Sequence, residues 1–300
     1  MGLFSFNYSK PGPGVNPDEP EKKGFFRFWE IIREKFSKLF GAITMLALFC
    51  IPYLIILYFI APINVQWLES LFQGTIADTA QLEETLVMID MMLRCIFALS
   101  IFMLWGSGPA SAMYAYISRC FTRRDPVWIV SDGFDKFKEN FKQSIIVVIV
   151  DILAIIFGTF AVSFYFNMLA QNGGVIWMLL SSLMVIMIVV YTWMHFYIYQ
   201  IMITFKCTIR QIYRNAALFA VGMLPINLFV TIINLAILIG LFMTGLQPLL
   251  IVLLDLIILA MFMRFLIEFT AARRIRKTLL DTPELSVPKH NETIGEDENN

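Results

Sequence analysis

The composition of this chain excludes a soluble globular protein. Of its 300 residues, 58% are hydrophobic and only 15% are charged, and the mean hydropathy is +0.72. The formal net charge is zero, with 23 basic and 23 acidic side chains, and the chain contains only two histidines, which excludes a histidine-rich metal site. The composition indicates an integral membrane protein.

The N-terminal 23 residues predict an irregular cytoplasmic arm, because four prolines fall within them. From Gly24 onward the pattern becomes helical. One face carries Phe25, Trp29, Ile32, Phe36 and Leu39, and most of the opposite face is filled by Arg27, Arg33, Lys35 and Lys38. We expect an interfacial amphipathic helix here, on the cytoplasmic side, leading into the first span.

Six apolar stretches follow, each long enough to cross a hydrocarbon core of about 30 Å. They run over residues 41–63, 95–117, 143–170, 175–205, 218–245 and 248–270. The expected fold is all-α, a polytopic helical membrane protein with six transmembrane helices, in which residues 24–277 form a single membrane domain. Residues 278–300 are expected to be a disordered cytoplasmic tail.

The basic residues predict the orientation. Only Arg94 and Arg264 lie in or beside a span, and the other 21 lie in the N-terminus, in 119–142, in 206–214 and in the C-terminus. The alternate connections, 64–90, 171–174 and 244–247, contain no Lys or Arg. Because Lys and Arg are retained in cytoplasmic loops, both termini are expected in the cytoplasm, where the basic face meets anionic lipid headgroups. Membrane orientation explains these charges, so no nucleic-acid partner is expected.

The second span is interrupted. Residues 81–94 predict an outer helix, with Asp90 and Arg94 paired one turn apart at the membrane boundary. Gly106, Gly108 and Pro109 then fall near the bilayer centre. The preferred interpretation is a kink that lets neighbouring helices pack closely. The alternative is a broken helix whose second half begins at Pro109 and whose free N–H groups face a midplane cavity.

The loop over residues 119–142 is expected to contain a second amphipathic helix on the cytoplasmic side, with phenylalanines along one face. Its segment 135–141 aligns with 34–40, and 206–217 is a weaker third copy. Two interpretations stay open. The chain contains three repeats, each an inner amphipathic helix followed by an out-and-back pair of spans, or its membrane flanks resemble one another by chance.

Ionisable side chains inside the spans are candidate site residues, because each is costly in lipid unless it is paired or hydrated. They are Asp151, Asp255, Arg264 and Glu268. Arg264 and Glu268 lie one turn apart and are expected to pair, and Asp151 lies at a depth from which it can reach Arg264. Asp255 lies in the outer half of the last span, where its expected partner is Asn234 or Arg94.

Two further polar features complete the candidate site. His195 stands between Tyr191 and Tyr199 near the inner end of the fourth span. Asn227, Thr231 and Asn234 form a polar stripe along the fifth span. The favoured interpretation of all these groups is interhelical contact, and the alternatives are a proton-linked switch at His195 and a solute path along the stripe.

No catalytic activity is expected, because HExxH, GxSxG, P-loop and GxGxxG motifs are absent. Asp151 and Asp255 belong to opposite leaflets and cannot act as an acid–base pair. The four cysteines lack CxxC spacing, so the sequence implies neither a zinc site nor a disulfide framework. No metal or other cofactor is expected.

Three stretches of the chain carry a family resemblance. They are Tyr-Ser-Lys-Pro-Gly-Pro-Gly-Val at 8–15, Gly-Pro-Ala-Ser-Ala-Met-Tyr at 108–114 and Phe-Lys-Glu-Asn-Phe-Lys-Gln at 137–143. Together they resemble the YesL family of bacterial integral membrane proteins, over most of the chain. The resemblance implies a bacterial plasma-membrane protein without established molecular function that accompanies carbohydrate-uptake systems. It implies an ABC-type sugar permease or another membrane protein as partner, and no catalytic residues.

Two functions remain open. The first is a non-catalytic accessory or regulatory component associated with carbohydrate uptake, which rests on the resemblance. The second is a small-solute transporter or channel that uses the interrupted second span. A transporter predicts a water-accessible cavity at mid-depth lined by the polar groups. An accessory protein predicts that these groups pair in a dry bundle with an apolar groove on its flank.

Overall fold

The computed structural model describes residues 24–73, 79–243 and 249–280, and within them it leaves out the side chains of 62–73, 79–89, 92, 96, 241–243, 249–256 and 280. The predicted arm at 1–23 and most of the predicted tail lie outside the described residues. Every regular element in the described part of the chain is helical, which confirms the all-α class.

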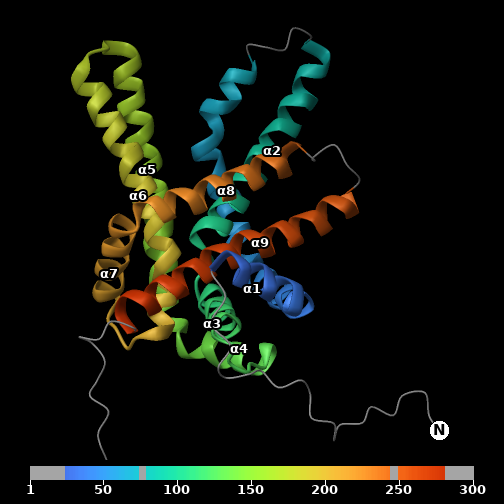
Figure 1. Cartoon of the computed structure of the whole chain (residues 1–300). Helices are drawn as coiled ribbons and strands as arrows, with labels where there is room; N and C mark the ends of the chain where they lie inside the picture. The colour runs from blue at the N-terminus through green and yellow to red at the C-terminus, as the bar shows by residue number, and fades with distance from the viewer. Residues whose placement is uncertain (1–23, 74–78, 244–248, 281–300) are drawn as a thin grey trace, which may run out of the picture.

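The elements follow one another with short connections. They are α1 Gly24–Gln73, α2 Thr79–Trp105, α3 Pro109–Arg123, α4 Ile129–Glu139, α5 Phe141–Asn172, α6 Val175–Thr204, α7 Ile209–Gly222, α8 Leu224–Met243, α9 Leu249–Ile275 and a π-helical turn, Arg276–Leu280. The α1–α2 and α5–α6 hairpins extend toward one end of the molecule, and α3, α4 and α7 lie toward the other (Figure 1). Helices α8 and α9 run at a large angle to both hairpins.

Three described helices are long and apolar enough to cross a membrane by themselves. They are Gly24–Ala61 within α1, α5 and α6. Two bent pairs, α2 with α3 and α7 with α8, raise the total to five if each pair forms one span. The predicted sixth span corresponds to α9, whose first eight side chains lie outside the described residues. The described residues therefore support three to five crossings, and the sixth stays a prediction.

Helix α1 joins the predicted amphipathic segment to the first span. The backbone leaves helical geometry only at Lys35, with φ −116° and ψ 18°. Two members of the predicted apolar face, Ile32 and Leu39, are buried, and its other members, Phe25, Trp29 and Phe36, are exposed. Arg27, from the predicted basic face, is also buried. Arg27 is accommodated by an ion pair with Glu30 at 2.7 Å. The interfacial helix stays a prediction, because an apolar face that lies in the membrane interface need not be buried within the protein.

The predicted fifth span, residues 218–245, is wrong as a continuous helix. Helix α7 ends at Gly222, α8 begins at Leu224, and their axes differ by 88°. Pro225 lacks an N–H donor and its ring obstructs the preceding turn, so α7 cannot continue through it. Helices α7 and α8 are long and apolar enough for a span only as a bent pair, and Leu218 belongs to α7.

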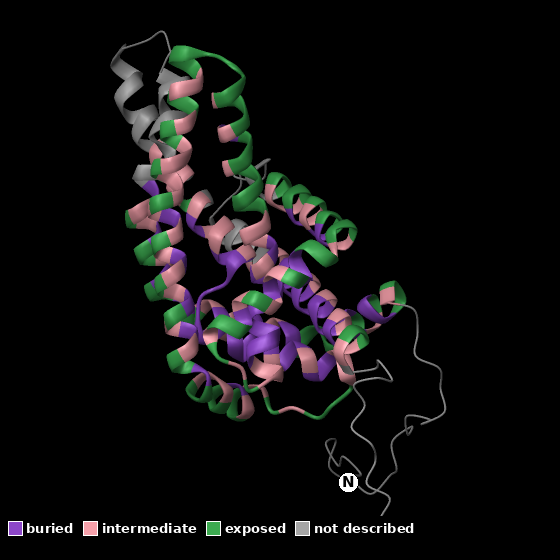
Figure 2. Ribbon diagram, turned by 90° about the vertical axis from the view of Figure 1, so that its left-hand side faces the viewer, coloured by how far each residue is buried: buried purple, intermediate pink, exposed green. Residues whose placement is uncertain are grey.

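Helix α3 is the centre of the core. It packs against α1, α4, α5, α6 and α9. Its small residues Ala110, Ser111, Ala112 and Ala115 are at most 1% exposed, which lets the surrounding helices approach closely. Figure 2 shows the buried residues gathered around this helix and mostly exposed or half-buried residues along the α5–α6 hairpin. The hairpin surface is rich in large apolar side chains such as Phe157 and Ile176, and it fits a membrane-embedded protein.

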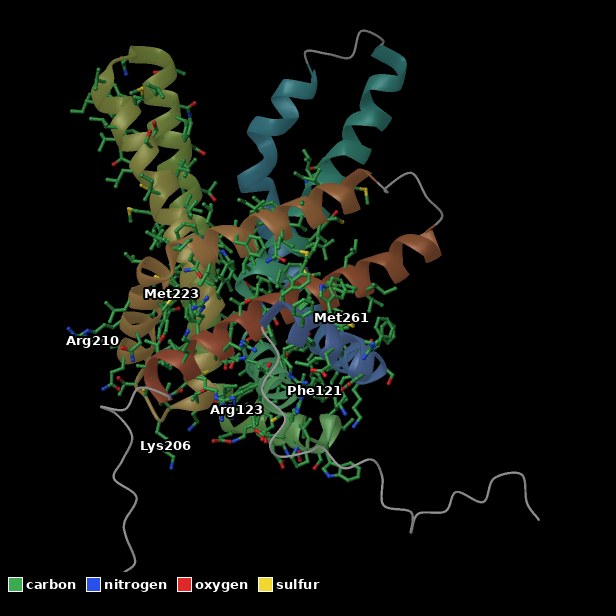
Figure 3. All side chains as sticks on the ribbon, in the orientation of Figure 1. Phe121, Arg123, Lys206, Arg210, Met223 and Met261 are labelled. Carbon is green, nitrogen blue, oxygen red and sulfur yellow. The ribbon has the colours of Figure 1, made fainter. Side chains whose placement is uncertain are left out.

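The four basic segments adjoin one another at the end of the molecule opposite the hairpin tips. Arg27 donates to the Phe121 carbonyl oxygen at 3.4 Å, and Arg119 donates to the Thr204 hydroxyl at 2.9 Å. Gly24 lies against the Arg273 guanidinium. Figure 3 shows Arg123 and Lys206 toward this end. The basic segments, which are far apart along the chain, thus lie together at one end of the folded molecule.

Candidate functional site

The second predicted span is broken. Helix α2 ends at Trp105, α3 begins at Pro109, and the two axes differ by 50°. Between them, Gly106 and Gly108 have φ of 90° and 72°. The preferred interpretation of this region as a kink is therefore wrong, and the alternative of a second half beginning at Pro109 is correct. The physical reason is that two residues with positive φ cannot belong to an α-helix.

Gly106 and Gly108 have no room for a side chain, and their positive φ also disfavours one. A Cβ on Gly106 would lie 2.5 Å from the Ser111 hydroxyl, and a Cβ on Gly108 would lie 2.6 Å from a methyl group of Val148. Positive φ is strained for residues with a side chain. The sequence Gly-Ser-Gly-Pro therefore encodes the break directly, with proline at the first position of α3.

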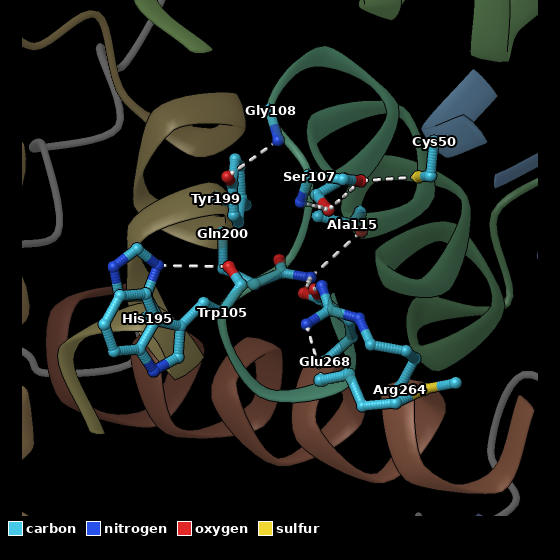
Figure 4. A network of polar contacts seen from close by, with 12 residues as sticks. Cys50, Trp105, Ser107, Gly108, Ala115, His195, Tyr199, Gln200, Arg264 and Glu268 are labelled. Carbon is cyan, nitrogen blue, oxygen red and sulfur yellow. Dashed lines mark hydrogen bonds and ion pairs between the residues drawn. The ribbon is translucent and has the colours of Figure 1, made fainter. Parts of the chain in front are cut away.

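The N–H groups freed by the break are hydrogen-bonded inside the protein. The Ser107 N–H donates to the Ser111 hydroxyl at 2.8 Å, and the Gly108 N–H donates to the Tyr199 hydroxyl at 2.9 Å (Figure 4). The Ser107 hydroxyl also contacts the Cys50 thiol at 2.6 Å. The expectation of a cavity concerned the N–H groups of the second half, and two of these, on Ser111 and Ala112, donate to the Gly108 carbonyl at 3.0 and 3.2 Å.

Two carbonyl groups freed by the break are bound by buried cationic or titratable side chains. In a continuous helix the Trp105 carbonyl would accept from residue 109, but Pro109 has no N–H. Instead, the Trp105 carbonyl accepts from Nδ1 of His195 at 3.0 Å (Figure 4). The Met103 carbonyl, whose usual donor would be Ser107, accepts from Arg264 at 3.1 Å. The break thus explains why these side chains are buried here.

Arg264 and Glu268 form the predicted pair. The guanidinium donates to Oε1 of Glu268 at 2.8 Å, with side-chain exposures of 0% and 2%. The Gln200 amide donates to Oε2 of Glu268 at 2.7 Å and to the Ala115 carbonyl at 2.9 Å. This network joins α2, α3, α6 and α9. Sequence reasoning missed Gln200, although an amide within an apolar span is a signal that a partner lies on another helix.

Asp151 pairs with His195 and not with Arg264, which corrects the expected partner. Oδ1 of Asp151 lies 3.0 Å from Nε2 of His195 and accepts a hydrogen bond from the Tyr191 hydroxyl at 2.7 Å. Both side chains are at most 1% exposed. The Trp105 ring stacks on the imidazole at a centroid distance of 5.2 Å. Tyr191 and Tyr199 lie one helical turn on either side of His195. Tyr191 therefore bonds to Asp151, and Tyr199 bonds to Gly108 in the break.

The polar stripe on α8 divides into three different roles. Asn227 donates to the Ala220 carbonyl at 2.9 Å and accepts from the Tyr197 hydroxyl at 2.6 Å, so it binds the end of α7 across the second break. Thr231 accepts from the Trp193 indole at 2.9 Å. Asn234 is fully buried, and neither polar atom of its side chain has a hydrogen-bond partner.

Of the remaining predicted site residues, Asp90 and Arg94 form their expected ion pair at 2.6 Å. The side chain of Asp255 lies outside the described residues. In the part of the chain that the structure describes, no three His, Cys, Asp or Glu side chains converge to hold a metal ion. The four cysteines are free thiols.

An open apolar groove of about 910 Å³ lies between α1 and α4. Met45 and Phe49 line it on α1, and Ile129 and Phe134 line it on α4. Phe49 reaches across to the Phe137 ring, with the two ring centroids 5.2 Å apart. The groove is therefore a feature of the flank and lies apart from the polar groups of the break.

Comparison with known proteins gives no relative for this chain. No protein-family model, no curated protein and no solved structure matches it.

Proposed function

We propose that this chain is a non-catalytic integral membrane protein that serves as an accessory or regulatory component of a larger membrane assembly. We also propose that it resides in a bacterial plasma membrane with both termini in the cytoplasm. The orientation rests on the basic segments, which adjoin one another at one end of the molecule.

The observation that carries this proposal is the pairing of the polar groups around the break. Arg264 is fully buried, yet it is neutralised by Glu268 and bound to the Met103 carbonyl. The Ser107 and Gly108 N–H groups are likewise bound by side chains of the same bundle. Groups that satisfy one another hold helices together, and a solute path would need them available to the solute.

The apolar groove between α1 and α4 supports the same proposal, because it offers a surface to a partner. Val130 lines it and is 71% exposed. The association with carbohydrate uptake, and an ABC-type sugar permease as partner, rest on the YesL resemblance alone.

Two measurements on the full chain test this proposal. Purified protein in liposomes is expected to give no uptake of any sugar in a panel, and saturable uptake would contradict the accessory role. A photo-crosslinking amino acid in place of Val130 is expected to capture a permease subunit in cells. The matched control is the same substitution at Ile176, which is 65% exposed on α6. Equal capture of the same subunit from both positions would count against the groove.

A small-solute transporter or channel is the second candidate, and one observation favours it. The break interrupts a span beside buried polar atoms without hydrogen-bond partners, which are Oδ2 of Asp151 and the hydroxyls of Tyr53 and Tyr213. Broken helices with such groups form substrate sites in many transporters. Saturable uptake that is abolished by Asp151→Asn would support this candidate over the accessory role.

A further inference from the structure

The hydrogen bond at Nδ1 of His195 fixes the position of one ring proton. Nδ1 lies 3.0 Å from the carbonyl oxygen of Trp105, and because a carbonyl oxygen only accepts, Nδ1 must donate. The parallel Trp105 ring, tilted by 9° from the imidazole, holds the ring in this orientation. A neutral imidazole carries one ring proton, so Nε2 of a neutral His195 is a bare acceptor.

That second nitrogen faces a carboxylate. Nε2 lies 3.0 Å from Oδ1 of Asp151, in a site where the two side chains are 0% and 1% exposed. The contact is close, but Nε2 has no aligned hydrogen-bond partner. A bare nitrogen and an ionised carboxylate would bring two electron-rich atoms together, whereas one added proton makes the contact attractive.

The other groups that face Asp151 supply no positive charge. They are the phenols of Tyr53 on α1, Tyr191 and Tyr199 on α6, and Tyr213 on α7. Arg264 on α9, the buried cation that also faces Tyr199, is held by Glu268. Among the described residues, no Lys or Arg forms an ion pair with Asp151. An ionised Asp151 beside a neutral His195 would therefore leave an uncompensated charge in the core.

We propose that Asp151 and His195 form a proton-binding site that holds one proton beyond the proton on Nδ1. The bound proton makes the pair neutral overall, either as an imidazolium beside a carboxylate or as a neutral imidazole beside a carboxylic acid. This site goes beyond the proposed function and does not depend on it. The same imidazole binds the Trp105 carbonyl through Nδ1, so the site lies directly at the end of α2 at the break.

His195 can be observed by itself, because the chain has only one other histidine, His290. His290→Gln leaves His195 as the single histidine, and ¹⁵N-histidine labelling then gives two ring-nitrogen signals in solid-state NMR of the full chain in lipid vesicles. At pH 7 we expect a protonated Nδ1 and an Nε2 that is either protonated or hydrogen-bonded to a carboxylic acid. An unbonded Nε2 signal at pH 7, or a bare Nδ1, would overturn the proposal.

Two carboxylate variants in the same background separate this site from the other buried pair. Asp151→Asn removes the acidic group, so the Nε2 signal is expected to move to that of a neutral acceptor. Glu268→Gln, the matched control in the Arg264 network, should leave both His195 signals unchanged. If Asp151→Asn retains the original Nε2 signal, Asp151 does not share the proton and the site is refuted. Should the variant fail to fold, the single-histidine spectrum still decides the question.

Discussion

A fully buried arginine is stable in this protein because its charge is paired and two of its three guanidinium nitrogens are hydrogen-bonded. Removing the guanidinium of Arg264 leaves Glu268 as a buried, uncompensated carboxylate and frees the Met103 carbonyl. Breaking a buried pair in this way costs about 3–5 kcal/mol. We therefore expect Arg264→Ala to lower the thermal unfolding temperature of the purified protein strongly.

The matched control for this prediction is Arg94→Ala. Arg94 and Asp90 form the same i, i+4 ion pair, but their side chains are 26% and 23% exposed. Such pairs contribute about 1 kcal/mol or less, so the unfolding temperature should change little. Equal changes in unfolding temperature for Arg264→Ala and Arg94→Ala would show that the Arg264 network contributes no more stability than the exposed pair.

At the scale of residues, sequence spacing predicts the partners that lie on one helix. It predicts Arg264 with Glu268 and Asp90 with Arg94, because four residues make one helical turn. It fails for Asp151, whose partner His195 lies on another helix 44 positions away. Depth in the membrane indicated Arg264 as the partner, but the packing of α5 against α6 brings His195 to Asp151 instead.

At the scale of elements, the two breaks follow one rule: side chains from outside the helix that ends bind the carbonyl groups that it frees. His195 and Arg264 bind carbonyls at the end of α2, and Asn227 binds the Ala220 carbonyl at the end of α7. Unsatisfied helix ends are costly in an apolar environment, so a break and its polar partners have to occur together.

The first break is expected to tolerate no side chain at Gly108. An alanine there combines strained φ with a Cβ 2.6 Å from Val148, and we expect the free energy of unfolding to fall by about 2 kcal/mol or more. Gly158→Ala is the control, because a Cβ at that helical position meets nothing within 4 Å. Thermal unfolding in detergent measures both variants. A Gly108→Ala protein as stable as Gly158→Ala would contradict the structure of the break.

The second break offers a matched pair of asparagines on α8, both at most 1% exposed. Asn227→Leu leaves the Ala220 carbonyl and the Tyr197 hydroxyl without their partner, which should cost about 2 kcal/mol or more. Asn234→Leu removes an amide that has no hydrogen-bond partner, so stability should be unchanged or higher. Chemical denaturation of the two variants compares them directly, and the opposite order would refute the assigned roles.

The sequence predicts single uninterrupted helices well and bent ones poorly. The boundaries of α5 and α6 differ from the predicted spans by at most two residues at either end, because apolar runs and the Gly173–Gly174 turn delimit them. At α7 and α8 the apolar pattern continues through the bend, so hydropathy could not locate it. Gly222 and Pro225 were the available signal.

At the scale of the whole molecule, two surfaces are separated. The α5–α6 hairpin exposes large apolar side chains, whereas the basic segments adjoin one another at the opposite end. A bilayer solvates the first kind of surface, and we propose that the second faces the cytoplasmic leaflet. Sequence charge alone predicted this polarity, because orientation depends on which loops hold Lys and Arg and not on how the helices pack.

The most direct test of this account is the side of the membrane on which each end lies. In a chain whose four cysteines are replaced, Gln171→Cys marks the exposed tip of the α5–α6 hairpin and Ser131→Cys marks exposed α4. A membrane-impermeant maleimide is predicted to label Gln171→Cys in intact cells and Ser131→Cys only after permeabilisation. Labelling of Ser131→Cys in intact cells, or protection of Gln171→Cys until the cells are opened, would contradict it.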